Sequence, residues 1–171
     1  MRNADSSSEV GTMDLPHRHI DRLLEAYGAS HRNIVNKLIH WLSVPVVYWC
    51  VLALLSTLPF PSGWRVVPGL DWAAVAALIA IAYYAVLAPA LAAGMAGFSL
   101  LCLILVAIYQ STGDLPIWQL ALFLFAMAWA AQFIGHKLER RKPSFFQDLQ
   151  FLLIGPAWLM AQIYRTIGLK Y

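Results

Sequence analysis

The chain has 171 residues, of which 60% are hydrophobic and only 12% are charged. Soluble domains carry roughly twice that share of charged residues, so the composition excludes an ordinary soluble domain. The net charge of +3 is modest and the basic residues flank apolar segments, which argues against a nucleic-acid partner. Cys50 and Cys102 both lie in apolar runs, which argues against a disulfide framework or a cysteine metal site. We therefore predict an all-α integral membrane helical bundle.

The amino-terminal part is predicted to be a tail followed by a short amphipathic helix. The first 16 residues are polar and lack the apolar core of a signal peptide, and we predict that residues 1–14 are disordered. Residues 15–171 are predicted to form one membrane-embedded helical domain. The helix is expected over Leu15 to Tyr27, with Gly28 as its C-cap and Ser30 as the N-cap of the next helix. One side of it would be apolar, made by Ile20, Leu23, Leu24 and Tyr27.

Four to five membrane segments are predicted after this helix. Only Arg65, Asp71 and Asp114 are charged between Ser43 and Gln132, and a spanning helix needs about 20 mostly apolar residues. The first four segments are residues 38–58, 72–88, 97–109 (starting near Pro89) and 117–136.

Two of these boundaries leave alternatives open. Pro89 and Gly94 predict a reversal between the second and third segments, with one long bent helix as the alternative. The fifth segment, Phe151 to Ile167, is interrupted by Gly155-Pro156. It is compatible with a full span or with a broken, re-entrant or interfacial helix.

The distribution of basic residues predicts the topology. Arg18, Arg22, Arg32 and Lys37 lie shortly before the first span. The fourth span is followed directly by Lys137, Arg140, Arg141 and Lys142, and the loops between the spans hold only Arg65. The positive-inside rule then places the amino end and residues 137–150 in the cytoplasm, which four crossings satisfy. The membrane would be the bacterial inner membrane, or the endoplasmic reticulum in a eukaryote. Three of the five histidines then share the cytoplasmic membrane face: His31, His40 and His136.

Two polar helix faces meet this membrane face. Asn36 and His40 are four residues apart and share one face, whereas His31, nine residues before His40, is half a turn out of phase. His31 can join that face only if the helix starts after it or bends. In the other segment, Gln132, His136 and Glu139 are spaced i, i+4 and i+7 and also share a face.

These faces predict a metal site with three histidine ligands. We expect His31, His40 and His136 to be the catalytic ligands, with Glu139 either competing as a ligand or orienting an imidazole. Asn36 and Gln132 would form hydrogen bonds behind them. Such a nitrogen-rich site suits iron, zinc or copper. The alternative is a structural polar network in a non-catalytic lipid-binding or scaffold protein.

The basic cluster has two interpretations. Lys137, Arg140, Arg141 and Lys142 can set topology and contact anionic headgroups of membrane lipids. One of them, or Arg32, could instead bind a substrate carboxylate. A fatty acid would fit this geometry, because its tail would lie in the bilayer while its carboxylate sat beside the histidines.

The motifs His31-x-Asn33-x-x-Asn36-x-x-x-His40-x-x-x-x-Pro45 and Gln132-Phe133-Ile134-Gly135-His136, with Lys142-Pro143 following, carry a resemblance. Over roughly residues 15–167, the chain resembles the membrane family of 2-hydroxy fatty acid dioxygenases. The resemblance implies an iron(II) enzyme that uses dioxygen to shorten a 2-hydroxy fatty acid by one carbon, in fatty-acid α-oxidation. The substrate hydroxyl and carboxylate can chelate iron. The family's histidines carry over onto His31, His40 and His136, with Asn33, Asn36, Gln132 and Glu139 in supporting positions.

The chain departs from the family pattern at two places. It has Pro143-Ser144-Phe145 where the family often has Pro-Ala-Leu, and Gln162 near a position that is often acidic. A di-iron hydroxylase would need more ligands than five histidines offer, and the sparse intramembrane charge argues against a transporter. The sequence sets neither the chain-length preference for the substrate nor the oligomeric state, and it is compatible with a homo-oligomer.

Overall fold

The computed structural model describes residues 18–29, 31, 33–61, 63, 69–138 and 145–170. Within these ranges the predicted all-α class is confirmed, since six helices and no strand are present. The helices are α1 (His19–Ala29), α2 (Ile34–Leu55), α3 (Trp72–Leu87), α4 (Pro89–Thr112), α5 (Ile117–Leu138) and α6 (Phe145–Thr166). The predicted tail, residues 1–14, lies outside the described residues.

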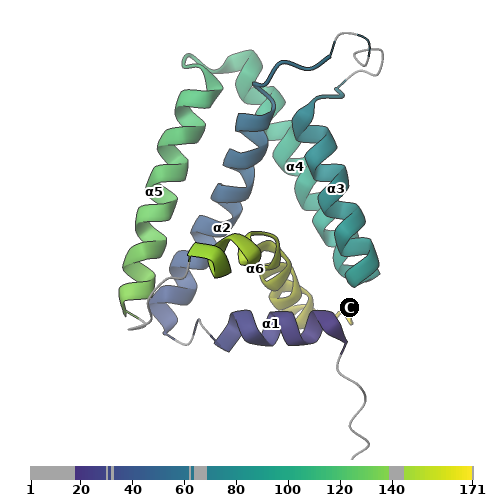
Figure 1. Ribbon diagram of the computed structural model, residues 1–171, viewed down its shortest axis with the longest axis vertical. Coiled ribbons are helices and arrows are strands. Elements are labelled where there is room, and N and C mark those ends of the chain that lie inside the picture. Colours follow the sequence, from purple (N-terminus) through teal and green to yellow (C-terminus); the bar gives the residue numbers. More distant parts are fainter. Residues whose placement is uncertain are drawn as a thin grey trace, which may run out of the picture.

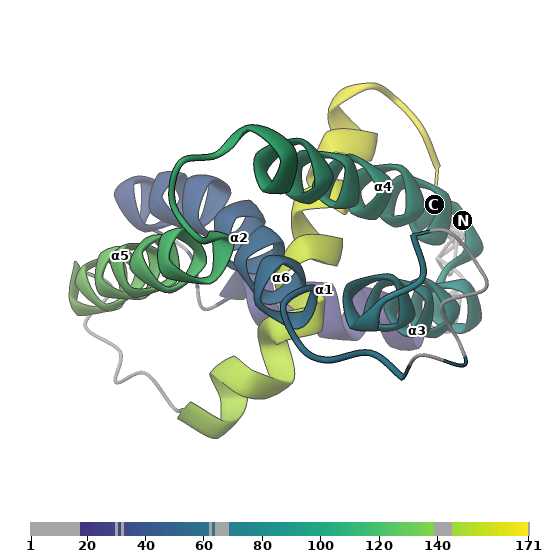
Figure 2. The same ribbon diagram turned by 90° about the horizontal axis from the view of Figure 1, so that it is seen from above.

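Four helices form the shaft of the molecule and two lie across one of its ends. Figure 1 shows α2, α3, α4 and α5 running along the long axis, with α1 and α6 at the lower end. The view from above shows α6 crossing beneath the shaft helices (Figure 2). The segment predicted over residues 151–167 therefore belongs to a helix that crosses this end and does not run alongside the spans. It is one continuous helix in spite of Pro156.

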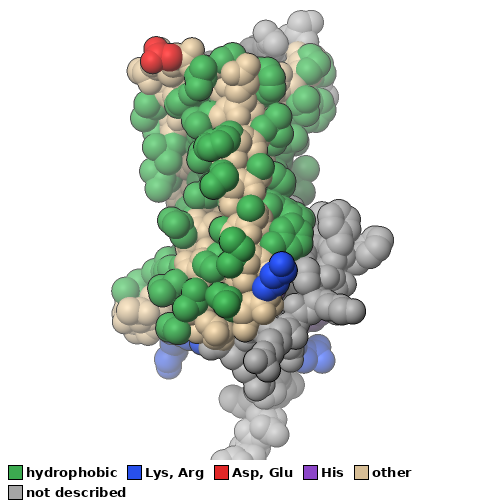
Figure 3. All heavy atoms as spheres, turned by 90° about the vertical axis from the view of Figure 1, so that its left-hand side faces the viewer, with side chains coloured by type: hydrophobic (Ala, Val, Ile, Leu, Met, Phe, Trp, Pro, Cys, Tyr) green, Lys and Arg blue, Asp and Glu red, His purple; other side chains and the backbone are tan. Residues whose placement is uncertain are grey.

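Three of the shaft helices are long and apolar enough to cross a membrane, namely α2, α4 and α5. Helix α3 is apolar but has only 16 residues, a rise of about 24 Å against a hydrocarbon core of about 30 Å. Hydrophobic side chains cover the shaft on the face shown in Figure 3. Lys and Arg side chains lie toward the α1 end of that face, and an acidic side chain lies at the opposite end.

Local sequence explains where the helices begin. Helix α2 starts at Ile34 and not near His31 as predicted, because the Asn33 side chain accepts hydrogen bonds from the backbone N–H groups of Val35 and Asn36. The predicted cap Ser30 lies outside the described residues. Asp71 caps α3 in the same way, through the backbone N–H of Ala74.

The predicted reversal between the second and third segments is confirmed at Pro89, whereas Gly94 lies within α4. Ala88 is extended, with φ −161° and ψ 100°, and Pro89 occupies the first turn of α4. Helices α3 and α4 then pack against each other. The alternative of one long bent helix is wrong, because this extended residue ends α3.

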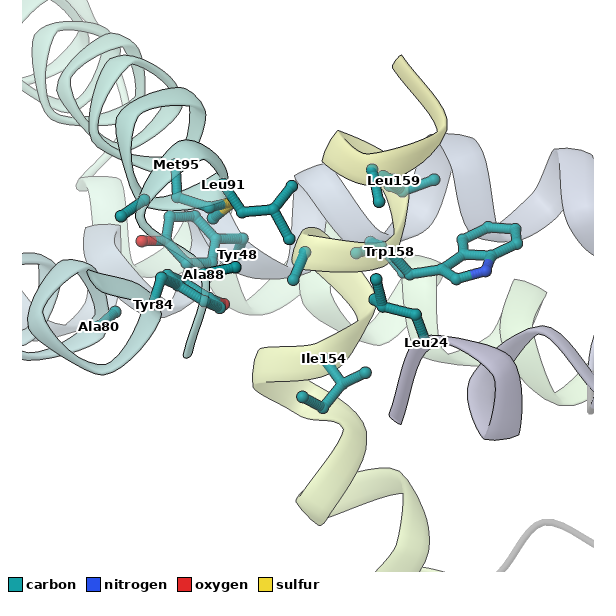
Figure 4. Close-up of a cluster of buried hydrophobic side chains, with 14 of the residues drawn as sticks. Leu24, Tyr48, Ala80, Tyr84, Ala88, Leu91, Met95, Ile154, Trp158 and Leu159 are labelled. Carbon is teal, nitrogen blue, oxygen red and sulfur yellow. The ribbon is translucent and has the colours of Figure 1, made fainter. Parts of the chain in front are cut away.

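A hydrophobic core joins the two crossing helices to the shaft. The buried face of α1 contains Ile20, Leu24 and Tyr27, three of the four residues predicted for its apolar side. Figure 4 shows Leu24 beside Ile154 and Trp158 of α6. This core reaches α2, α3 and α4, so α1 and α6 are held against the shaft by burial of apolar surface.

A buried phenol links the shaft to α6. The Tyr84 hydroxyl, near the end of α3, donates to the main-chain oxygen of Leu153 at 2.5 Å. We expect Tyr84→Phe to lower the free energy of unfolding by about 1 kcal/mol, because the carbonyl loses a partner while the ring packing remains. Thermal unfolding of the detergent-purified protein measures this change. An unchanged midpoint would show that the hydrogen bond does not stabilise the fold.

Candidate metal centre

Three histidines meet at the end of the shaft that α1 and α6 cover. His31 lies in the connection between α1 and α2, His40 in the second turn of α2, and His136 in the last turn of α5. One ring nitrogen of each can be chosen so that all three lie within 4.8 Å of one another. His31 and His40 are each only 3% exposed, whereas His136 is half-buried. Two of the three imidazoles are therefore buried, and the third is partly exposed to solvent.

His31 reaches the cluster because it precedes the helix. Helix α2 begins at Ile34, after His31, so the two histidines do not lie on one helix. The half-turn offset expected between His31 and His40 on a regular helix therefore does not apply. The Nδ1 atom of His31 lies 2.7 Å from the main-chain oxygen of Tyr27. A carbonyl oxygen can only accept, so Nδ1 carries the proton and the lone pair of a neutral ring is on Nε2.

His40 has the same arrangement within its own helix. Its Nδ1 lies 3.0 Å from the main-chain oxygen of Asn36, one turn earlier, which again places the lone pair on Nε2. The rings of His31 and His40 meet edge to face with centroids 4.2 Å apart. A backbone carbonyl thus fixes the orientation and tautomer of both rings, as is common behind metal-binding histidines.

The third histidine depends on a close contact between α2 and α5. Gly135 precedes His136, and a Cβ at this position would overlap Oδ1 of Asn36. One turn earlier on α5, the Gln132 side chain donates from Nε2 to Oγ of Ser43 at 3.0 Å. The missing Cβ of Gly135 lets α5 approach α2 closely, and the hydrogen bond joins the two helices. The centroid of the His136 ring lies 5.1 Å from that of His40.

The donor set fits a transition-metal ion. Bonds from such an ion to imidazole nitrogen are about 2.1 Å, so two nitrogens on one ion lie roughly 3 to 4 Å apart. The 4.8 Å limit of this cluster is within about 1 Å of that range, a difference that small ring rotations cover. Three neutral imidazoles suit iron, zinc or copper and leave further coordination positions for other ligands.

The structure gives several predicted residues definite places. Asn33 caps α2, Asn36 is fully buried between α2 and α5, and Gln132 bonds Ser43. Lys137, adjacent to His136, is exposed. Four predicted residues lie outside the described part of the chain, namely Arg32, Glu139, Arg141 and Lys142. Among the described residues, the three histidines are the only group that could hold a metal ion.

Four neighbours of the cluster were absent from the predicted site. Tyr27 stacks on His31, with centroids 4.3 Å apart and an angle of 21° between the rings, and Trp158 lies 6.1 Å from His31. Gly135 and Ser43 provide the contacts on α5 and α2. Tyr27 is four residues before His31, and this helical spacing could have indicated a contact between the two. Because Tyr27 belongs to the apolar side of the first helix, the sequence assigns it to the core instead. Nothing in the sequence near Trp158 points to the histidines.

Comparisons with known proteins identify the family of the chain. Residues 17–167 match the model of a family described as 2-hydroxy-palmitic acid dioxygenase Mpo1-like. The chain is 28% identical over 144 residues to the 2-hydroxy-palmitic acid dioxygenase MPO1 of Saccharomyces cerevisiae, covering 83% of this chain and 78% of that protein. No solved structure matches. Because the family model covers most of the chain, including all three histidines, the chain belongs to the Mpo1-like 2-hydroxy-palmitic acid dioxygenase family.

Proposed function

We propose that this protein is an iron(II)-dependent dioxygenase that shortens 2-hydroxy fatty acids by one carbon. The observation that carries the proposal is the cluster of three histidine nitrogens within 4.8 Å at one end of a membrane bundle. The yeast relative is a 2-hydroxy-palmitic acid dioxygenase by name, which supports a long-chain 2-hydroxy acid and dioxygen as substrates. The metal ligands would be His31, His40 and His136, with Glu139 as a further candidate.

The residues around the cluster would orient ligands and substrate. Iron(II), when bound, would supply the activation of dioxygen and the attachment point for the substrate. The backbone oxygens of Tyr27 and Asn36 keep His31 and His40 in the tautomer that presents Nε2 as a ligand. His136 is half-buried, so substrate would approach the cluster from its side.

The substrate would lie along the membrane surface of this end. Apolar side chains beside the cluster are exposed, among them Ile34, Leu38 and Leu138, and they suit contact with acyl chains. Exposed Lys137 offers a positive charge for the carboxylate, and Arg32, Arg141 and Lys142 are the other candidates. The acyl tail could then remain in the apolar layer while the head of the substrate reaches the histidines.

We further propose that the histidine end faces the cytoplasm. Four of the described basic residues, Arg18, Arg22, Lys37 and Lys137, belong to this end, as the positive-inside rule requires. Anionic lipid headgroups would then contact the same surface.

Product analysis tests the reaction and its need for metal. Detergent-purified protein loaded anaerobically with Fe(II) is given 2-hydroxypalmitate and air, and products are measured by mass spectrometry. We expect a fatty acid one carbon shorter, and we expect stripping the metal with a chelator to abolish its formation and added Fe(II) to restore it. An iron-loaded protein that leaves 2-hydroxy acids of several lengths intact would contradict the proposal.

A second candidate is a non-catalytic lipid-binding or scaffold protein with a structural polar network. The hydrogen bond between Gln132 and Ser43 favours it, because it joins α2 to α5 without any metal. Iron stoichiometry separates the two candidates. One tightly bound iron per chain supports the dioxygenase, whereas no bound iron supports the network.

A further inference from the structure

His31 stands apart from the other two histidines because no helix holds it. Its backbone N–H donates to the Gly28 oxygen at 3.0 Å, and the residue lies two positions beyond the end of α1. A residue in a connection has more conformational freedom than one in the middle of a helix. Something other than secondary structure must therefore fix the His31 ring where His40 and His136 can meet it.

Tyr27 contacts the His31 ring in two ways. Its main-chain oxygen accepts a hydrogen bond from Nδ1 at 2.7 Å, and its side chain stacks on the imidazole with centroids 4.3 Å apart. The carbonyl fixes the direction of Nδ1, and the stacked ring restricts rotation about the side-chain bonds. Tyr27 is itself 5% exposed, so its own ring has little room to move.

Helix α6 supports this stack from behind. The Trp158 ring lies 5.4 Å from that of Tyr27 and 6.1 Å from that of His31. Two glycines mark how closely the helices meet. A Cβ at Gly28 would lie 3.3 Å from Nε1 of Trp158, and one at Gly155 would lie 3.2 Å from the Tyr27 hydroxyl. Helices α1 and α6 thus fit tightly around the aromatic pair.

We propose that Tyr27 and Trp158 are positioning residues that hold His31 in the orientation needed for metal binding. This proposal rests on the proposed metal centre, since it assigns to α1 and α6 the task of completing it. Neither aromatic side chain is placed as a ligand, and both act only through His31. Helices α2 and α5 carry His40 and His136, and the Tyr27–Trp158 pair holds the third ligand, His31, in place.

Cobalt(II) titration of the full-length protein in detergent tests the proposal through affinity and visible spectrum, without reference to turnover. Replacing groups that orient metal ligands typically weakens binding about 10–100-fold. We expect Tyr27→Leu, which keeps the main-chain oxygen but removes the stacking ring, to weaken Co(II) binding by about 10-fold or more. Tyr27→Phe should rescue most of the affinity, because the ring remains. Trp158→Phe should give a smaller loss of the same kind.

A double-variant comparison separates positioning from general loss of stability. In a His31→Ala background, Tyr27→Leu should have no further effect on Co(II) affinity, since the residue through which it acts is gone. The matched control is Phe60→Leu, which removes a buried aromatic ring beyond the far end of α2. It should change thermal stability but leave the affinity and the spectrum unaltered.

The outcomes distinguish the two proposals. If the unaltered protein binds one Co(II) and Tyr27→Leu binds it equally well, the positioning role is wrong and the metal centre stands. If Tyr27→Leu lowers Co(II) affinity equally in the unaltered protein and in the His31→Ala variant, the positioning role is also wrong. If the unaltered protein binds no Co(II), the metal centre fails, and the positioning role fails with it.

Discussion

Replacing His136 with alanine is expected to lower both iron affinity and turnover by more than about 100-fold. Loss of a group that only orients a ligand costs about 10–100-fold in affinity or activity, and loss of a ligand should cost more. His136 is the best of the three histidines to replace, because it is half-buried and its removal leaves the smallest cavity. Iron content per chain and the rate of fatty-acid shortening measure the effect.

The matched control is His19→Ala, at the exposed start of α1. This histidine lies outside the cluster, and we expect iron content and turnover to remain at the level of the unaltered protein. Thermal unfolding of both variants checks that the fold survives. A His136→Ala protein that keeps one iron and full turnover would remove this residue from the ligand set.

Replacing Gly135 with alanine is expected to destabilise the protein by about 1–3 kcal/mol, the usual cost of overpacking. The added Cβ would overlap Oδ1 of Asn36, whose side chain is fully buried. Helix α5 must then move away from α2 and carry the next residue, His136, away from His40. We therefore expect weaker metal binding together with the lower unfolding temperature.

Two comparisons make this prediction specific. Gly97→Ala, within α4, places a Cβ where no other atom lies within 4 Å, and it should change stability by about 1 kcal/mol or less without altering metal binding. Combining Gly135→Ala with Asn36→Ala removes the overlapping oxygen. The double variant should recover part of the lost affinity, by a coupling of about 0.5–3 kcal/mol. Additive effects would show that the two residues do not meet.

The helices and two of the three histidine positions follow from sequence because both depend on local spacing. Apolar segments between Pro and Gly residues predicted the four shaft helices, although α2 ends at Leu55, before the predicted 58. Spacings of four residues predicted that Asn36 shares a face with His40, and Gln132 with His136. The facing contacts Ser43–Gln132 and Asn36–Gly135 then bring these two faces together.

The surroundings of His31 could not be predicted in the same way, because they depend on tertiary packing. Whether His31 can reach the face of His40 depends on where α2 begins. Several polar residues could have capped this helix, and Asn33 is the one that does. Trp158 is 127 positions from His31 in the chain, and no local pattern relates them. Its place follows from how α6 crosses the end of the bundle, which hydropathy alone left open.

The three histidines also divide the chain into very unequal parts. His31 and His40 leave the ribosome close together, whereas His136 appears only after α3, α4 and most of α5 have been made. An ion held by all three would join the beginning of the bundle to its last shaft helix and close a loop of nearly the whole membrane domain. Because closing long loops restricts the unfolded chain most, metal loading would act as a late cross-link that stabilises the completed bundle.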